Sequence, residues 1–307
     1  MLAGLVIAAR IAEFLGAVVT FGSPLFLLYA QREAPEALGH GWSRRLLIGA
    51  GLFVLFGTAG ALLGQTATMA GDPAAATDPA TLWEVISGSQ FGLATAVRLT
   101  AALASLLAVL AWAPSRRLWC ALTGLGVVVL ASFAWTGHGA ADDGLAGLAH
   151  LGADVLHLLA AGVWLGALAA LLMLALTTDF ADLAATHLLH GALAGFSGVG
   201  SGVVAILVLT GLINSWFLIG PSHLVDIASS TYGLILCAKL AAFAAMLGLA
   251  ALNRFGLTPR LETASTDAAA ASVRADLRWS LLLETAAGGL VLGLVGALGA
   301  LAPLSAQ

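Results

Sequence analysis

The stretch WTGHGAADDGLAGLAHLGADVLHLLAAGVWLGAL, residues 135–168, places ionisable side chains in a long apolar segment. A glycine-rich turn carries His138, and the apolar segment that follows carries His150, Asp154 and His157. The last three are spaced at i, i+4 and i+7, so in a helix they lie within about 60° of one another on one face. Because ionisable groups are costly to hold on an apolar helix, this face indicates a functional site.

The composition decides the environment of that helix. Hydrophobic residues make up 60% of the 307-residue chain, charged residues make up 9%, and the mean hydropathy is +1.01. Soluble domains carry about 25% charged residues, so this chain is expected to be an integral membrane protein in a lipid bilayer. A formal charge of -4 without a basic run excludes a nucleic-acid partner. Cys120 and Cys237 lie in separate apolar segments, which argues against a disulfide or a thiolate metal site.

Hydropathy predicts an all-α polytopic membrane protein, a bundle of eight transmembrane helices in one domain spanning residues 1–307. A short amphipathic segment at residues 82–86 is expected to lie at the membrane interface. The eight predicted helices cover approximately residues 2–29, 44–69, 91–112, 118–136, 145–176, 192–219, 231–253 and 279–301.

Arginine placement predicts the orientation of the bundle. The loops on one side of the predicted bundle, with their edges, contain Arg32, Arg44, Arg45, Arg116, Arg117, Arg254, Arg260, Arg274 and Arg278. The loops between predicted helices 2 and 3, 4 and 5, and 6 and 7 contain no Lys or Arg. By the positive-inside rule the arginine side is cytoplasmic, so both termini are expected outside, in the periplasm.

This topology places Met69, His138 and His150 near the outer surface and His157 about 10 Å deeper. Imidazoles suit copper and zinc, and a thioether favours Cu(I). One ion cannot easily bridge His150 and His157, which are two turns apart. We therefore expect a metal site that combines His150, Asp154 or His157 with His138 and Met69. The alternative is that these histidines only form hydrogen bonds inside the bundle.

Further ionisable residues lie inside the predicted spans and form a possible intramembrane charge network with Asp154: Arg10, Glu13, Arg98, Lys239 and Glu284. Three bases and three acids permit complete internal pairing, and Arg10 can pair with Glu13 on one helix face. A structural ion-pair network and a proton or cation relay both remain open.

Two secondary metal sites are also possible. His187 with His190, and His223 with Asp226, have the i, i+3 spacing that puts two side chains on one helix face. The alternative for each pair is a solvated polar face.

Several segments together resemble the copper-resistance protein D (CopD) family, and the resemblance covers nearly the whole chain. The most specific are GHGAA at 137–141 and ADVLHLLAAGVWLGAL at 153–168. The others are TATMAG at 66–71, TGLINSW at 210–216, TYGLILCAKL at 231–240, LNRFGLTPRL at 252–261 and LLLETAAGGLVL at 281–292.

The resemblance implies a multi-pass protein of the bacterial inner membrane that imports copper, as Cu(I) or Cu(II), and is not an enzyme. The chain has no Met-rich or His-rich extension, so a separate periplasmic copper carrier protein is a possible partner. Two alternatives remain. One is an assembly factor that delivers copper without net flux. The other is a haem-binding membrane electron carrier, which would need histidines facing each other at matched depths.

Overall fold

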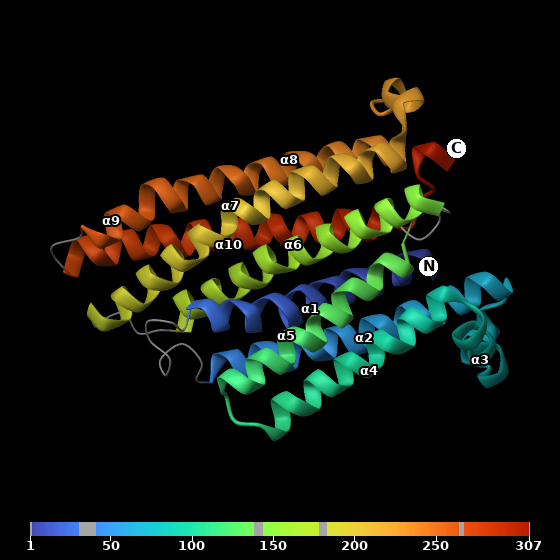
Figure 1. Cartoon of the computed structure of the whole chain (residues 1–307), viewed down its shortest axis with the longest axis horizontal. Coiled ribbons are helices and arrows are strands. Elements are labelled where there is room, and N and C mark those ends of the chain that lie inside the picture. The colour runs from blue at the N-terminus through green and yellow to red at the C-terminus, as the bar shows by residue number, and fades with distance from the viewer. Residues whose placement is uncertain (1, 31–40, 138–143, 178–182, 264–266, 307) are drawn as a thin grey trace.

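A computed structural model describes residues 2–30, 41–137, 144–177, 183–263 and 267–306, and in these ranges the chain is helical with no β-strand (Figure 1). Within these described ranges, eight helices are long and apolar enough to cross a membrane, which confirms the predicted number of spans. The helices are α1 Leu2–Ala30, α2 Trp42–Ala70, α3 Pro79–Gly88, α4 Gln90–Ala111, α5 Arg116–Ala131, α6 Gly144–Thr177, α7 Leu183–Ile219, α8 Thr231–Leu252, α9 Thr258–Glu262 and α10 Asp267–Leu298.

Two helices begin earlier than expected. Helix α7 begins at Leu183 and α10 begins at Asp267, whereas the predicted spans begin near residues 192 and 279. A π-helical turn at Asn253–Leu257 and then α9 follow α8, so much of the segment between the predicted spans 231–253 and 279–301 is helical. The physical reason is the buried apolar residues that these extensions contribute to the core, namely Leu189, Leu257, Leu261, Val273 and Leu277.

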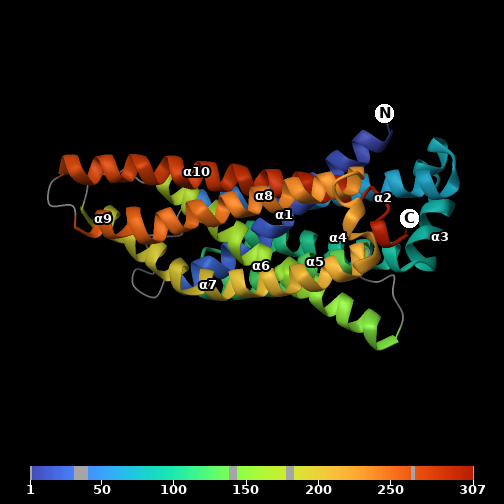
Figure 2. The same cartoon turned by 90° about the horizontal axis from the view of Figure 1, so that it is seen from above.

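The bundle consists of two groups of four long helices. Helices α1, α2, α4 and α5 form one group, and α6, α7, α8 and α10 form the other (Figures 1 and 2). The two groups meet mainly where α1 packs along α6. Helix α1 begins and α10 ends at the same end of the bundle, which we call the terminus end. The opposite, arginine-rich end contains Arg44, Arg45, Arg116, Arg117, Arg254, Arg260, Arg274 and Arg278, while Arg32 lies outside the described residues.

Direct backbone contact joins α1 to α6. A Cβ atom on Gly166 would lie 2.4 Å from the Cα of Gly22, and one on Gly22 would lie 1.9 Å from the carbonyl oxygen of Gly162. The Ser23 hydroxyl donates a hydrogen bond of 2.7 Å to the Gly166 carbonyl. Small residues allow this approach, which gives van der Waals contact where lipid supplies no hydrophobic driving force between helices. The position of α6 in the bundle therefore depends on these glycines.

The short helix α3 lies at the terminus end, between α2 and α4 (Figure 1). Asp78 caps its N-terminus by accepting hydrogen bonds from the hydroxyl and backbone N–H of Thr81. These bonds favour the charged carboxylate and lower the pKa of Asp78 below its usual value. Trp83 is exposed on α3, which agrees with the predicted amphipathic segment.

We predict that Gly166→Ala lowers the thermal stability of the purified protein in detergent. The added methyl group meets backbone, so the helices must separate, at a cost of about 1–3 kcal/mol. Gly152→Ala is the matched control on the same helix, because a Cβ there meets no atom within 4 Å. Alanine is the better helix former, so the control is expected to melt at or slightly above the wild-type temperature. An unchanged melting temperature for Gly166→Ala would contradict this packing.

Candidate functional site

The polar face of α6 packs against a polar face of α7 that runs antiparallel to it. The Nδ1 atom of His157 lies 2.8 Å from the Oγ1 atom of Thr210. One turn away, the Nδ2 atom of Asn214 donates to the Oδ1 atom of Asp154 at 3.4 Å. The partner helix of His157, which the sequence does not name, is therefore α7.

His150 continues the same pattern with an aromatic partner. Its ring stacks on Phe217 with a centroid separation of 4.5 Å and an interplanar angle of 4°. The side chain is buried near the start of α6, at the terminus end of the bundle. Helix α7 contributes no histidine opposite the α6 histidines within the described residues, so the two facing axial ligands that a haem would need are not found there.

The hydrogen bonds of Thr210 determine the tautomer of His157. Its hydroxyl donates to the carbonyl of Ile206 at 2.6 Å, which uses the one proton that the hydroxyl has. Thr210 must then accept from Nδ1–H of His157, so the lone pair of the neutral imidazole is on Nε2. A hydrogen-bond partner on one ring nitrogen that fixes the tautomer is the usual arrangement around histidines that bind metals.

A cavity of about 210 Å³, which we call the terminus-side cavity, is bordered by His150, Asp154, His157 and Asn214. Helices α1, α6, α7, α8 and α10 contribute to its wall. Gly211 lies beside the imidazole of His157, where even an added Cβ would remain 3.6 Å from Cε1, so the ring edge stays accessible. The polar side chains that line the cavity include Arg10, His150, Asp154, His157, Asn214 and Lys239.

Of the two other residues predicted for the main metal site, only Met69 is among the described residues. Met69 is exposed on the last turn of α2 and does not line the cavity. His138 lies outside the described residues. Across the described part of the chain, no three His, Cys, Asp or Glu side chains converge closely enough to hold a metal ion. Cys120 and Cys237 are both free and exposed.

The secondary residues that the structure describes contact other partners. His190 lies 3.9 Å from the carboxylate of Glu262, and the side chain of His187 lies outside the described residues. Nδ1 of His223 is 3.2 Å from the carbonyl of Ile219 and 3.1 Å from the hydroxyl of Ser222. No contact between His223 and the exposed Asp226 is found among the described residues.

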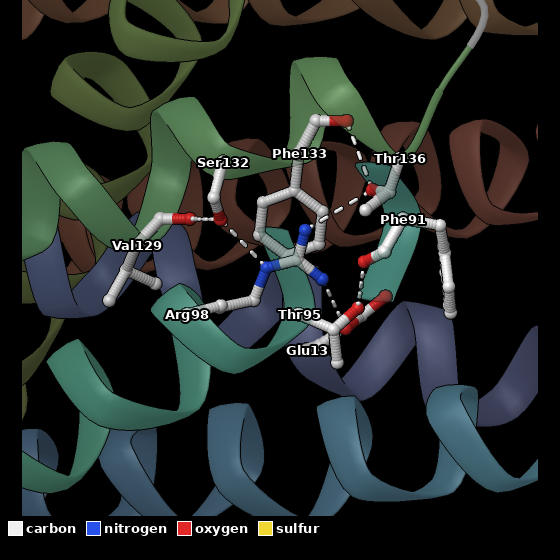
Figure 3. A network of polar contacts seen from close by, with 8 residues as sticks. All are labelled: Glu13, Phe91, Thr95, Arg98, Val129, Ser132, Phe133 and Thr136. Atoms are coloured by element: carbon white, nitrogen blue, oxygen red, sulfur yellow. Dashed lines mark hydrogen bonds and ion pairs between the residues drawn. The ribbon is translucent and has the colours of Figure 1, made fainter. Parts of the chain in front are cut away.

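Within the first group of helices, Arg98 is the centre of a buried polar network (Figure 3). Its guanidinium donates to Glu13 at 3.0 Å, to Ser132 at 2.9 Å and to Thr136 at 3.1 Å. It also lies 3.5 Å from the centroid of the Phe133 ring, a cation–π contact. Both charged side chains are almost completely buried.

This network corrects the expected pairing of Arg10 with Glu13. Glu13 pairs with Arg98 of α4. The Arg98 guanidinium is buried, and two hydroxyl groups and an aromatic ring also stabilise it there. Arg10 instead donates to the carbonyl of Gly299 at 2.8 Å, after the end of α10. The predicted charge network is therefore divided, since Lys239 and Glu284 lie in the other group of helices.

The sequence interpretation missed the α7 residues Thr210, Asn214 and Phe217. A signal for them existed, because their i, i+4, i+7 spacing repeats the spacing of the polar face on α6. Two of them, Thr210 and Asn214, are in the segment TGLINSW at 210–216.

An eight-helix bundle with histidine, carboxylate and lysine side chains around an internal cavity defines a polytopic membrane protein with a polar intramembrane site. Residues 1–148 match the family described as copper resistance protein D-like, N-terminal domain, and residues 190–298 match the family copper resistance protein D. The chain is also 35% identical to copper resistance protein D of Pseudomonas syringae pv. tomato over 312 residues, covering 97% of this chain and 96% of the relative.

The chain therefore belongs to the copper resistance protein D family, which indicates a role in copper handling at a membrane. This confirms the family resemblance of the sequence segments. No solved structure matches the chain.

We predict that the Glu13–Arg98 pair serves stability. Arg98→Met leaves a carboxylate buried without its cation, and breaking a buried pair in this way costs about 3–5 kcal/mol. Thermal unfolding in detergent should show a large loss for Arg98→Met and a partial recovery when Glu13→Gln is added. Arg44→Met is the control, because this exposed arginine donates to the Leu110 carbonyl at the surface. Full stability of Arg98→Met would contradict this role.

Proposed function

We propose that this protein carries copper across the bacterial inner membrane toward the cytoplasm. Copper would pass along the polar face of α6, from His150 past Asp154 to His157. The observation that carries the proposal is the position of these three side chains on the wall of one intramembrane cavity, in a chain of a copper-handling family. Imidazole nitrogen is a good ligand for both oxidation states of copper, and the carboxylate adds negative charge.

The spacing of these groups favours transfer over storage. His150 and His157 are about 10 Å apart along the helix, so an ion would contact them in succession. A site with few ligands holds an ion weakly, and conduction requires that binding is not too tight for release. Lys239 lines the same cavity, so its positive charge would oppose long residence of a cation beside Asp154.

The direction of transport follows from the proposed orientation. With the arginine-rich end in the cytoplasm, as the positive-inside rule predicts, the terminus-side cavity faces the periplasm. Copper would then arrive from a periplasmic copper carrier protein. The proposal assigns the protein no catalytic step. Delivery of copper to a partner without net flux is the alternative that the experiments below separate.

We predict that His157→Ala abolishes copper-dependent accumulation in cells while the protein remains folded in the membrane. The substitution removes the deepest imidazole on the proposed path. His223→Gln is the matched control, because it removes a histidine at the terminus end that does not line the cavity. Cell-associated copper is measured by mass spectrometry and normalised to the amount of folded protein. Unchanged accumulation in His157→Ala would overturn the assignment of this residue.

Proteoliposomes separate transport from delivery. Purified protein reconstituted into vesicles should move Cu(I) to the side of an entrapped copper indicator, and His157→Ala should not. Binding of copper without flux in the wild type would favour a delivery factor and refute the transport proposal.

The role of Thr210 gives a separate prediction. Thr210→Val removes the acceptor that holds Nδ1–H of His157, so the lone pair is no longer held on Nε2. Loss of such a partner typically reduces metal affinity or activity by about 10–100-fold. Thr210→Ser keeps the hydroxyl and should retain most of the copper flux. Equal flux in the valine and serine variants would show that the tautomer of His157 does not matter.

A further inference from the structure

Three cavities follow one another along α6 and α7. A middle cavity of about 260 Å³ shares His157 and Lys239 with the terminus-side cavity. An arginine-side cavity of about 350 Å³ lies beyond it, and Trp164 lines both of these. The indole of Trp164 therefore forms part of the wall between the middle cavity and the cavity near the arginine-rich end.

Glu284 of α10 lies directly behind this wall. Its carboxylate accepts a hydrogen bond of 2.9 Å from the indole N–H of Trp164 at Oε1 and one of 3.0 Å from the amide of Asn253 at Oε2. The Glu284 side chain is 1% exposed, and it borders the arginine-side cavity. It therefore connects α10 with α6 and with the turn that follows α8.

Asn253 carries a second, independent signal. It is 7% exposed, and its Oδ1 atom is buried with no hydrogen-bond partner. Because Nδ2 donates to Glu284, the orientation of the amide is fixed and Oδ1 is the free acceptor. A buried polar atom without a partner is costly, so Oδ1 is an acceptor that a neighbouring donor would satisfy.

The carboxylate of Glu284 also lacks a balancing charge. Among the described residues no cationic group lies within ion-pair distance of it, in contrast to Glu13, which Arg98 neutralises. Arg254 lines the arginine-side cavity but is exposed, and its guanidinium donates to Ser201. Lys239 lines the middle and terminus-side cavities instead. The residues of α6, α7 and α9 that line the arginine-side cavity carry no titratable group.

We propose that Glu284 and Asn253 form a proton-binding site that exchanges with water at the arginine-rich end through the arginine-side cavity. A proton taken from water would convert the carboxylate to a neutral carboxylic acid, and its release to water would restore the charge. Neutralisation removes the cost of an unpaired charge in a membrane interior. The new O–H needs an acceptor, and Oδ1 of Asn253 is an unoccupied one in the residue that already contacts the carboxylate.

The chemistry favours a proton over a metal ion. A carboxylate and one amide oxygen are hard ligands and unsuited to Cu(I), which prefers sulfur and imidazole. The two hydrogen bonds from Trp164 and Asn253 already occupy part of the carboxylate. This site does not depend on the proposed copper path, because none of its residues belongs to it.

The test is infrared difference spectroscopy of the full chain in lipid vesicles, between acidic and alkaline buffer. We expect a carbonyl band of a buried carboxylic acid that disappears in Glu284→Gln. Glu262→Gln is the control, because this carboxylate is exposed at the same end of the bundle. The band should persist in that variant.

Trp164→Phe gives a second measurement that keeps most of the aromatic volume. It removes the hydrogen bond to Oε1, so the carbonyl band is expected at higher frequency. A band that is insensitive to both the Glu284 and the Trp164 substitutions would overturn the proposal. A response to sodium chloride without a response to pH would also overturn it, by showing a metal cation in place of the proton. Neither outcome depends on whether the protein moves copper.

Discussion

The cost of an uncompensated charge in a low-dielectric interior governs the arrangement of this bundle. Arg98 and Glu13 meet that cost with an ion pair, two hydroxyl bonds and an aromatic contact. The pair lies in the first group of helices, where α1, α4 and α5 meet. Fully satisfied polar networks make a core rigid and specific. The first group thus provides a fixed support against which α6 can be held.

The glycine contact between α1 and α6 fixes the position of α6, and so of its polar face, relative to the first group of helices. Gly22 and Gly166 bring the two backbones together, so one side of α6 is fixed by packing. The opposite side is left for α7, with Thr210 and Asn214 facing His157 and Asp154. Because α1 also borders the terminus-side cavity, the same contact helps to set the cavity width.

Sequence reasoning recovered the properties that depend on composition and helical period. Long apolar segments predicted eight spans, and the spacing of His150, Asp154 and His157 predicted their shared helix face. The pairing of Glu13 was wrong, because spacing along one helix describes only local partners and Arg98 is 85 residues away. The link between Trp164 and Glu284 could not be predicted either, since contacts across helices depend on their rotation and relative height.

The three intramembrane acids differ in how completely they are compensated, and this order matches their proposed roles. Glu13 has a cation at 3.0 Å and serves stability. Asp154 has a long hydrogen bond from Asn214 and shares a cavity with Lys239, so an incoming cation can compete for it. Glu284 has only neutral donors among the described residues, so its negative charge is uncompensated and the binding of a proton would neutralise it. Function in this bundle is thus expected where compensation is incomplete, because only there can a mobile positive charge lower the free energy.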